Sequence, residues 1–523
     1  MNTSDSEIRY PVGIQSFPEI ISGGYVYVDK TAFIHRLVRE GKYYFLARPR
    51  RFGKSLLLST IEAYFQGRRE LFKGLALDSL TDDWDAHPVL HLDLNTADYT
   101  DPDSLNRVLN SFLDRWENLY GPTNHDTQPS LRFGEVIRNA FAKTGKQVVI
   151  LIDEYDKPLL NCVDNEPLAD RFRNMLKAFY GNLKSMDDYI KIGIMTGVAR
   201  FSKVSIFSDV NNLRDISFQD EYSAICGISQ REVDTYFDYG IRAIADKTGK
   251  SVEETRMDLR KIYDGYHFSR ESEDIYNPYS LMYAFANKTI GDFWFESGTP
   301  SFLAKRVRNG HYRLKDLDSY YIDASALATA GIMSKNPIPV LFQSGYLTIK
   351  GYDEEFNQYI LGYPNAEVKN SFLKALMPLY VEGEGIDTNF DIRRFVHDVR
   401  NGECEEFMNR LDAMVAAVPY SEKGSAPEAH FQNVIYLIFT LMGYYTQMEQ
   451  RISNGRIDVT VETSDYVYIF EFKINASAEA AMAQIHEKEY WRPYKSRDKQ
   501  IIMIGASFNS SERRLDSYLI ERL

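Results

Sequence analysis

The tripeptide Gly53-Lys54-Ser55 has the residue types that hold the phosphates of a nucleoside triphosphate. A glycine lets backbone N–H groups face the phosphate oxygens, a lysine reaches the β- and γ-phosphates, and a hydroxyl ligates Mg²⁺. The apolar run Tyr43–Leu46 precedes the tripeptide and a leucine-rich helical pattern follows it, which is the strand–loop–helix context that this chemistry requires. We therefore predict that ATP is bound by the loop residues Arg51, Phe52, Gly53, Lys54, Ser55 and Leu56.

The loop departs from the general phosphate-binding pattern at one position. That pattern, Gly-x-x-x-x-Gly-Lys-[Ser/Thr], has a glycine five residues before its second glycine, and this chain has Arg48 there. A Gly-Lys-Ser tripeptide is also common by chance, so the loop alone is weak evidence for nucleotide binding. A second, matching site is needed to support it.

A run of five apolar residues, 148–152, is followed by the acidic pair Asp153-Glu154. Such a run is typical of a buried parallel strand. We expect this strand to lie beside the strand that carries the loop, so that Asp153 holds Mg²⁺ through water and Glu154 orients or deprotonates the attacking water. The alternative is a core strand that simply ends in a solvated turn. Because the acids occur together with the lysine loop, we predict a site for ATP and Mg²⁺.

The residues from about 10 to 220 alternate short strand-like runs with helical stretches, which predicts a parallel α/β sheet with helices on both faces. The fourth expected strand ends in Thr196 and a glycine. A hydroxyl at that end of a strand can sense the γ-phosphate, so Thr196 joins the predicted nucleotide site. The four expected strands are Tyr43–Leu46, Val89–Leu94, Val148–Ile152 and Ile192–Thr196.

Beyond about residue 225 the pattern changes to helices punctuated by turn signals, among them Asp264-Gly265 and Asn277-Pro278. This change predicts a helical lid or linker region. Segment 380–418 has acidic residues at helical spacing and is expected to be an amphipathic connector, and 421–427 is the clearest linker sequence. The expected domains are a phosphate-loop ATPase domain at 1–222, the helical region at 223–370, and a C-terminal part at 371–523 whose core spans about 425–523.

A second group of chemistry-bearing residues follows that linker. Alternating residues predict a hairpin of two strands, with Asp458 early in the first strand and Glu471 and Lys473 at the end of the second. Residues two apart in a strand project to the same face, so Glu471 and Lys473 should lie side by side. Phosphodiester cleavage needs carboxylates that hold one or two Mg²⁺ ions and a lysine that positions or deprotonates water, and this hairpin supplies both.

The elements around the hairpin follow the order of a nuclease core, which is helix, hairpin, helix, strand. Glu428 opens the long apolar helix before the hairpin. Gln484 lies on the helix after it, which is expected over 476–494 and is followed by a strand at 501–505. A surface hairpin with an incidental charge pair is the alternative, and catalytic activity is a separate question. The predicted catalytic residues are Asp458, Glu471, Lys473 and Gln484, and the predicted metal ligands are Glu428, Asp458 and Glu471.

Composition limits the class of protein. At 523 residues the chain is too long for one core, and its hydrophobic fraction of 44% and charged fraction of 26% are ordinary for a globular protein. The net charge of −13 argues against a broadly basic nucleic-acid coat, although a nuclease can hold phosphates in a local cleft. No window approaches the ~20 apolar residues of a membrane span, and the N-terminus does not resemble a signal peptide. We therefore expect a cytoplasmic protein with no membrane partner.

Taken together, these motifs resemble the bacterial family that joins an AAA-ATPase-like domain to a C-terminal PD-(D/E)XK nuclease-superfamily domain. The resemblance covers nearly the whole chain and implies an N-terminal AAA-like sheet and a C-terminal restriction-endonuclease-like fold. It makes Arg48 an expected residue, because the family's phosphate loop looks like Arg-Pro-Arg-Arg-Phe-Gly-Lys-Ser. It also places Arg200 after the fourth strand, where an arginine can contact the γ-phosphate in cis or a neighbour's nucleotide in trans; a salt-bridged surface arginine is the alternative. The motifs that carry the resemblance are 27–31, 48–55, 153–156, 196–203, 455–458, 471–473 and 484–485.

Two functions follow from these expectations. In the first, ATP and Mg²⁺ bind at the N-terminal site, Glu154 activates water, and the nucleotide state gates a Mg²⁺-dependent nuclease that acts on DNA or RNA. Genome defence or mobile-element control is a setting suggested by analogy. In the second, the protein is a nucleotide-dependent switch or scaffold whose C-terminal domain binds nucleic acid or a partner protein without cutting. The sequence leaves the substrate and the oligomeric state open, a homo-oligomer included.

Overall fold

The computed structural model of the chain forms two compact units, and each is described by itself. The first comprises residues 1–296 and 320–367, and the second comprises 297–319 and 368–523. The structure describes residues 8–123, 128–162, 165–199, 212–294, 301–310, 312–329, 336–380, 388–416, 427–446, 450–452, 457–512 and 514–523.

A five-stranded sheet forms the centre of the first unit. Its strand order is β2-β3-β4-β1-β5, and all neighbouring strands pair in parallel. The four expected strands are confirmed, whereas β5 was not predicted because two residues carry no readable pattern. The strands are β1 (Tyr43–Ala47), β2 (Val89–Asp93), β3 (Val148–Asp153), β4 (Ile190–Gly197) and β5 (Arg214–Asp215).

One expectation about this sheet was wrong. The strand with the acidic pair does not lie beside the strand with the phosphate loop, because β4 lies between β3 and β1 and pairs with both. Gly193 in β4 permits this close packing, since a Cβ there would come within 2.9 Å of the Tyr43 ring. The acids can still reach the loop, because the carboxyl ends of parallel strands meet at one edge of the sheet.

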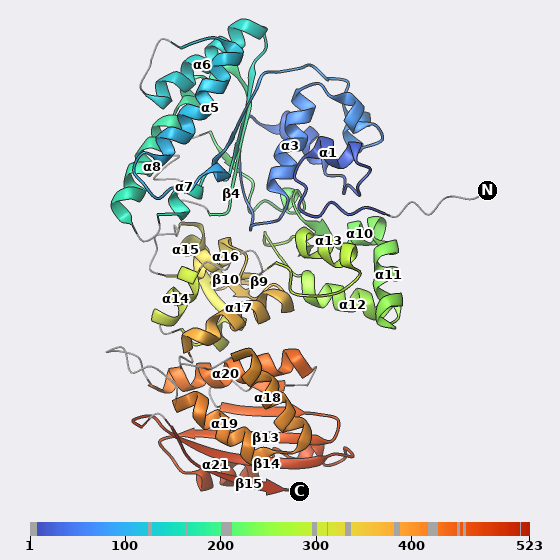
Figure 1. Ribbon diagram of the computed structural model, residues 1–523, viewed down its shortest axis with the longest axis vertical. Helices are drawn as coiled ribbons and strands as arrows, with labels where there is room; N and C mark the ends of the chain where they lie inside the picture. Colours follow the sequence, from blue (N-terminus) through green and yellow to red (C-terminus); the bar gives the residue numbers. More distant parts are fainter. Residues whose placement is uncertain are drawn as a thin grey trace, which may run out of the picture. The chain divides into compact units, whose positions relative to one another are not determined.

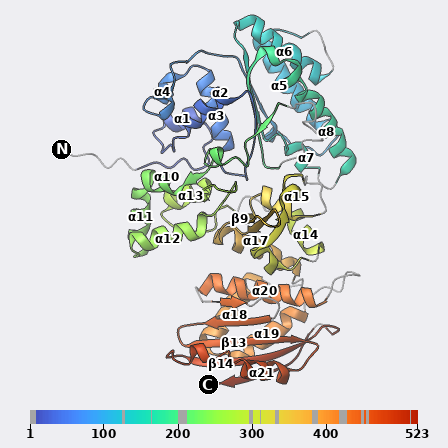
Figure 2. The same cartoon turned by 180° about the vertical axis from the view of Figure 1, so that it is seen from behind.

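Helices cover both faces of this sheet, as predicted. In Figure 1, α5, α6 and α8 lie on one face and α1 and α3 lie on the other, and Figure 2 shows the same layers from behind. Aromatic packing joins the helices of the first face, where Phe133 of α6 stacks on Phe179 of α8 with ring centroids 4.2 Å apart. These helices are α1 (Phe17–Ser22), α2 (Thr31–Glu40), α3 (Lys54–Phe65), α4 (Ala76–Leu80), α5 (Ser104–Tyr120), α6 (Pro129–Thr144), α7 (Lys157–Leu160), α8 (Glu166–Tyr180) and α9 (Asn182–Ser185).

The helical region expected after the sheet is also present. Ser229 and Ser251 begin α10 and α12 with capping boxes, in which the serine and the glutamate three residues later bond each other's backbone N–H groups. The core of the region contains Phe237 and Phe285, whose rings stack 4.9 Å apart. The elements are β6 (Ile228–Ser229), α10 (Gln230–Tyr236), α11 (Asp238–Thr248), α12 (Val252–Tyr263), β7 (Ile275–Tyr276) and α13 (Pro278–Asn287).

A three-stranded antiparallel sheet in the first unit was not predicted. Its middle strand, β10, pairs Tyr359 with Ile322 of β8 and with Tyr352 of β9. The pattern of the sequence does not reveal it, because β8 comes from a separate segment and its pairing depends on tertiary context. The elements of this part are β8 (Tyr320–Asp323), α15 (Ala324–Thr329), α16 (Ile338–Gln343), β9 (Thr348–Asp353), β10 (Gln358–Gly362) and the start of α17 (Ala366–Tyr380).

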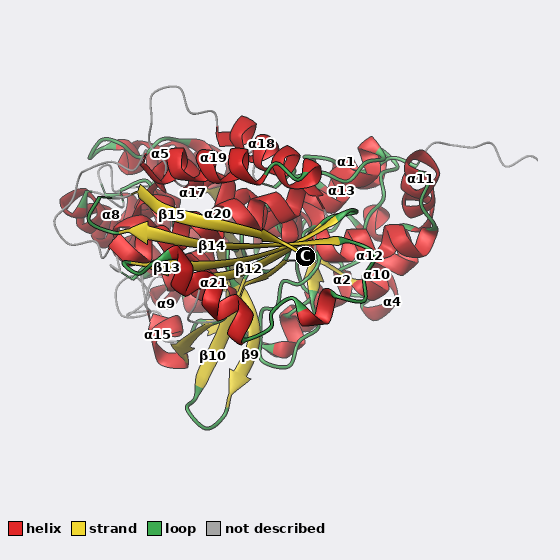
Figure 3. Cartoon of the chain, turned by 90° about the horizontal axis from the view of Figure 1, so that it is seen from below, coloured by secondary structure: helices red, strands yellow, loops and turns green. Residues whose placement is uncertain are grey.

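The second unit contains a five-stranded sheet that packs against helices on both faces (Figure 3). Along β13, Ile469 clusters with Ile485 of α21, whereas the next residue, Phe470, contacts Phe439 of α20. Successive strand residues project to opposite faces, so α21 and α20 lie on different sides of the sheet. The elements are α14 (Ser301–Asn309), α18 (Thr388–Asn401), α19 (Cys404–Ala416), α20 (Pro427–Thr446), β11 (Gln450–Ile452), β12 (Ile457–Glu462), β13 (Tyr466–Ile474), α21 (Ala478–Glu487), β14 (Gln500–Asn509) and β15 (Arg514–Arg522).

The order of this sheet is β11-β12-β13-β14-β15, with a parallel pair at β13–β14 and antiparallel pairs elsewhere. The predicted hairpin is therefore confirmed as β12 and β13. The helix expected over 476–494 is shorter, because it ends at Glu487 and Glu489 then takes a left-handed backbone conformation with φ of 46°. Most of the linker expected at 421–427 lies outside the described residues.

Across the described ranges, every helix is too short or too polar to cross a membrane.

Candidate nucleotide site and nuclease-like site

The phosphate loop connects the end of β1 to the first residue of α3. Two of its residues, Arg51 and Gly53, have left-handed backbone conformations, with φ of 68° and 91°. Left-handed residues in such a loop turn backbone N–H groups into a shared concavity that suits an anion. Glycine adopts this conformation freely, whereas Arg51 adopts it at a cost that is typical of functional sites.

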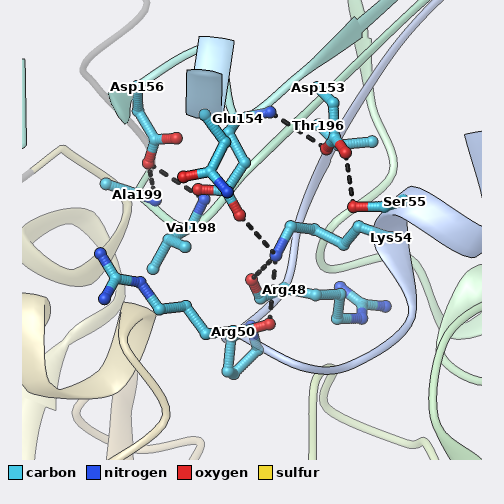
Figure 4. Close-up of polar contacts among 12 residues, drawn as sticks. Arg48, Arg50, Lys54, Ser55, Asp153, Glu154, Asp156, Thr196, Val198 and Ala199 are labelled. Carbon is cyan, nitrogen blue, oxygen red and sulfur yellow. Dashed lines mark hydrogen bonds and ion pairs between the residues drawn. The ribbon is translucent and has the colours of Figure 1, made fainter. Parts of the chain in front are cut away.

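Lys54 is held in the middle of this site by neutral groups and one acid. Its side chain is 4% exposed, and its Nζ donates to the backbone oxygens of Arg48 at 3.1 Å and Pro49 at 3.2 Å. The same Nζ lies 3.9 Å from Oε1 of Glu154 (Figure 4). Carbonyls are weaker partners for an ammonium than phosphate oxygens are, so Lys54 can exchange them when an anion enters the loop.

Three elements meet at the carboxylate of Asp153. Ser55 of α3 bonds its Oδ2 at 2.5 Å, and Thr196 of β4 donates its hydroxyl to Oδ1 (Figure 4). Asp153 itself is 4% exposed. The structure thus brings the predicted loop, acid and sensor residues together. A carboxylate beside a hydroxyl offers the hard oxygen ligands that Mg²⁺ prefers, so this donor set fits the predicted ion.

Glu154 has an unusual backbone for a residue with a side chain. Its φ is 52°, and its backbone N–H donates to Oδ1 of Asp153 at 3.0 Å. A non-glycine residue in this region stores ~1–3 kcal/mol of strain, and such residues gather at active sites. In this conformation the Glu154 carboxylate lies toward Lys54 (Figure 4).

Asp156 was given no role by the sequence, yet it organises the end of β4. It is fully buried, and its Oδ2 accepts the backbone N–H groups of Val198, at 3.0 Å, and Ala199. Tyr155 adds a hydrogen bond from its hydroxyl to the Ala199 oxygen at 2.7 Å. Burial, and next the Glu154 carboxylate, raise the pKa of Asp156 to about 7. The second aspartate of the Asp-Glu-Tyr-Asp motif is the signal that could have revealed it.

The side chains of Arg51 and Phe52 are engaged by the helical region. The Arg51 guanidinium lies 3.6 Å from the centroid of the Tyr279 ring, and the Phe52 ring packs edge-on with those of Tyr266 and Phe268. The helical region therefore holds the side chains of both loop residues.

A small apolar cleft opens beside Gly53 and Leu56. It is lined by the segment before α2, by the start of α3, and by the chain around Cys226 together with α13. The sequence does not reveal this cleft, because the segments that form it are far apart along the chain. Its apolar lining includes Val26, Val28, Leu57, Ile225, Ile228 and Met282.

The second site lies on β13 and α21. Glu471 is fully buried, and Lys473 donates to its Oε1 at 2.8 Å. Lys473 also donates to Oε1 of Gln484, whose Nε2 donates to the hydroxyl of Tyr490 at 3.2 Å. The structure therefore brings Glu471, Lys473 and Gln484 together, and the period-two spacing predicted this for Glu471 and Lys473. Tyr490, which had no assigned role, orients the amide of Gln484.

Asp458 is the direct partner of Glu471 in the antiparallel β12–β13 pair. Directly opposed residues project to the same face with Cβ atoms about 5 Å apart, so two carboxylates at these positions can share a metal ion. The side chains of Asp458 and Glu428, and the whole of Arg200, lie outside the described part of the structure. Their roles stay predictions.

Two family profiles match the two regions that contain these sites. The family described as "Predicted AAA-ATPase" matches residues 11–207, which include the phosphate loop, the acidic pair and Thr196. The PD-(D/E)XK nuclease superfamily matches residues 426–518, which include the hairpin and α21. No solved structure matches the chain significantly.

One relative matches over its whole length. It is described as "Uncharacterized protein in vnfD 5'region", from Azotobacter chroococcum mcd 1, and is 33% identical to this chain over 530 residues, covering 99% of this chain and 100% of the relative. Because the match extends over both regions, the chain belongs to the family of AAA-ATPase-like proteins that carry a C-terminal PD-(D/E)XK nuclease-superfamily domain.

Proposed function

We propose that this protein binds and hydrolyses ATP with Mg²⁺ at its N-terminal site, and that the nucleotide state regulates a C-terminal Mg²⁺-dependent nuclease that acts on DNA or RNA. One observation carries the proposal for ATP. The hydroxyls of Ser55 and Thr196 converge on Asp153, beside a buried lysine at the start of a helix. This arrangement supplies a metal site, a phosphate-binding cation and a group that can sense the phosphate within one pocket.

In the proposed hydrolysis, Ser55 and, through water, Asp153 would hold Mg²⁺, which would supply positive charge beside the phosphates. Lys54 exchanges the loop carbonyls for the β- and γ-phosphates. This movement weakens its contact with Glu154, which lies 3.9 Å away. Glu154 is then free to orient water and accept its proton. Thr196 senses the γ-phosphate with its hydroxyl.

The apolar cleft beside Gly53 is the proposed site for the adenine ring. It opens next to the loop and is lined by aliphatic side chains, which suit the faces of a base. Because one wall is formed by the helical region, the base would contact both the sheet domain and the lid.

In the proposed nuclease, Asp458 and Glu471 hold the metal ion, with Glu428 as a further ligand. Lys473 positions or deprotonates the attacking water, and Gln484 fixes the lysine by accepting its hydrogen bond. The hydrogen bond from Lys473 to Glu471 supports this assignment, because it places the cation beside a metal-binding carboxylate.

Further parts of the proposal rest on the sequence. Arg200 would contact the γ-phosphate in cis or, in a homo-oligomer, a neighbour's nucleotide in trans. The proposed domains are 1–222, 223–370 and 371–523, and the proposed location is the cytoplasm. Genome defence or mobile-element control is the proposed setting.

The experiment that tests the proposal measures both activities in the same preparations. Phosphate release from ATP and cleavage of single- and double-stranded DNA and RNA are assayed with Mg²⁺ or Mn²⁺, with and without ATP. Wild type is compared with Lys54→Ala, Asp458→Ala and Lys473→Ala. We expect Lys54→Ala to lose ATP hydrolysis and the effect of ATP on cleavage, and Asp458→Ala and Lys473→Ala to lose cleavage alone. A wild-type protein without either activity would refute the proposal.

The second candidate is a nucleotide-dependent switch whose C-terminal domain binds nucleic acid or a protein without cutting. The net charge of −13 favours it, because an acidic chain attracts nucleic acid poorly outside a local cleft. Mn²⁺ soaked into crystals distinguishes the two. Density between Asp458 and Glu471 supports the nuclease, whereas an empty site with Lys473 turned away supports the switch.

A further inference from the structure

Arg48 occupies the loop position where the general phosphate-binding pattern has a glycine. Its side chain is almost completely buried, with 1% of the residue exposed. Figure 4 shows its guanidinium directed away from the carboxylates of Asp153 and Glu154. This arginine is therefore placed to act on the loop rather than on a phosphate.

The guanidinium of Arg48 binds four backbone oxygens at once. Nη1 donates to the oxygens of Ala47 at 2.9 Å and Ser217 at 2.8 Å. Nη2 donates to those of Tyr222 at 3.1 Å and Ser223 at 3.4 Å. A planar group with five donors can join these carbonyls in one geometry, whereas the point charge of lysine cannot. Arg48 thus connects the loop to the segment 217–223.

The charge of Arg48 is buried, and the carboxylate of Asp215 is the acid that attracts it. One face of the guanidinium lies 4.2 Å from the centroid of the Phe268 ring, and burial lowers the pKa of Arg48 to about 10. Carbonyl dipoles and an aromatic face compensate a buried charge only in part. An apolar side chain would fill the same volume at a lower cost, so packing alone does not explain an arginine here.

The main chain of Arg48 connects the same position to the catalytic groups. Its backbone N–H donates to the oxygen of Gly197 at the end of β4, at 3.1 Å. Its backbone oxygen accepts the hydrogen bond from Lys54 at 3.1 Å. A movement of segment 217–223 or of Phe268 therefore acts on the peptide that orients the phosphate-binding lysine.

We propose that Arg48 is a positioning residue for nucleotide binding, which holds the loop and Lys54 in their binding geometry by tying them to segment 217–223 and to Phe268. The inference rests on the proposed function, because it requires that the loop binds a nucleotide. If Arg48 has this role, the affinity of the loop for nucleotide depends on Phe268 and so on the helical region that follows the sheet. This role also explains why a loop without the usual first glycine can form.

The test compares Arg48→Lys, which keeps the charge, with Arg48→Gly, which restores the general pattern. Phe268→Leu is the third variant, and it removes the aromatic ring that lies against the Arg48 guanidinium. The matched control is Arg132→Lys, since Arg132 is also buried, with 7% exposed, but pairs with Asp114 and Glu117 on α5. Each protein is titrated with a fluorescent ADP and with Mg·ATP, and thermal unfolding, KM and kcat are measured in parallel.

We expect the dissociation constant for nucleotide to rise about tenfold or more in both Arg48 variants, and by a smaller factor in Phe268→Leu. We expect Arg132→Lys to lower the unfolding temperature without changing the dissociation constant. Nucleotide affinity equal to wild type in folded Arg48→Lys, or an equal loss in Arg132→Lys, would overturn the inference while leaving the proposed function intact. A wild-type protein that binds no nucleotide would overturn both. If Arg48→Gly does not fold, Arg48→Lys and Phe268→Leu still decide the outcome.

Discussion

At Glu154 the backbone and the chemistry favour different residue types. A φ of 52° favours glycine, whereas activation of water requires a carboxylate. The chain keeps the glutamate and is held in the strained conformation by a bond from its own N–H to Asp153. The identity of Glu154 was readable from the sequence, but its conformation was not, because left-handed geometry here results from the contacts around β3.

Replacement of Glu154 by glutamine tests the role of its carboxylate. Glutamine keeps the size of the side chain but cannot take a proton from water, so we expect ATP turnover to fall by ~10²–10⁴-fold. We expect the dissociation constant for Mg·ATP to stay within about threefold of wild type, since the loop and metal ligands are unchanged. Glu62→Gln on α3 is the control, because Glu62 pairs with His91 at 2.8 Å. Wild-type turnover in Glu154→Gln would assign the base to another group.

At the scale of elements, the end of β4 depends on a glycine. A Cβ at Gly197 would lie 2.6 Å from Oδ1 of Asp156 and 2.6 Å from the Tyr155 ring. Asp156 and Tyr155, which follow β3, can therefore pack against the end of β4 only because residue 197 has no side chain. The sequence predicts that Gly197 ends a strand. It does not predict that Asp156 and Tyr155 pack against this glycine, because that contact depends on the order of the strands.

The substitution Gly197→Ala should destabilise the first unit by about 1–3 kcal/mol, because the added methyl forces Asp156 and Tyr155 to move. We also expect reduced ATP turnover, since Thr196 is the preceding residue. Denaturant unfolding and phosphate release measure the two effects. The control is Gly351→Ala in β9, where the nearest atom to the new Cβ is at an ordinary 3.5 Å. Equal stability of the two variants would contradict this account of the β4 end.

A buried acid near the start of α17 makes the stability of the first unit depend on pH. Oε1 of Glu367 accepts the backbone N–H groups of Phe293 at 2.6 Å and Trp294 at 2.8 Å, and the hydroxyl of Ser280 at 3.0 Å. Burial raises the pKa of Glu367 to about 7, against these hydrogen bonds, which lower it. The folded state therefore keeps a proton that the unfolded chain releases near pH 4.5.

Stability should fall as the pH rises through this range. Between the unfolded and folded pKa values the folded state binds more protons, so the free energy of unfolding decreases with rising pH. From pH 5 to pH 8 we expect wild type to lose about 2 kcal/mol relative to Glu367→Gln, which does not titrate. Urea unfolding of both proteins at the two pH values measures the difference. Parallel pH profiles would show that Glu367 keeps an ordinary pKa.

At the scale of the whole molecule, the second unit is assembled from two separate stretches of chain. Asn433 of α20, 4% exposed, accepts the backbone N–H of Leu314 at 2.8 Å and donates to the oxygen of Tyr312 at 2.9 Å. Tyr436 donates its hydroxyl to Asp318 at 2.8 Å. The long apolar helix of the nuclease-like region therefore needs residues that precede it by more than a hundred positions.

A fragment of residues 371–523 should consequently be less stable than the same fragment joined to 297–319 through a flexible linker. Without the earlier segment, Asn433 loses buried hydrogen bonds, each of which costs ~1–3 kcal/mol when left unmade. Circular dichroism during heating, with a hydrophobic dye to detect exposed apolar surface, compares the two. Cooperative melting at the same temperature would show that the earlier segment is dispensable.

The sequence by itself determined the residue types of both sites and the elements that carry them. Gly-Lys-Ser after an apolar strand, an acidic pair after another, and Asp and Glu-x-Lys on a hairpin are local patterns, and local backbone preferences are enough to place them. They also identified the family and four strands of the N-terminal sheet.

Only the tertiary structure decided how these parts meet. It placed β4 between the strands of the loop and the acids, gave Asp156 and Arg48 their partners, formed the cleft beside Gly53 and built the second unit from two stretches. Each of these features joins residues that are distant along the chain. Their contacts depend on strand order and packing, which side-chain periodicity does not encode.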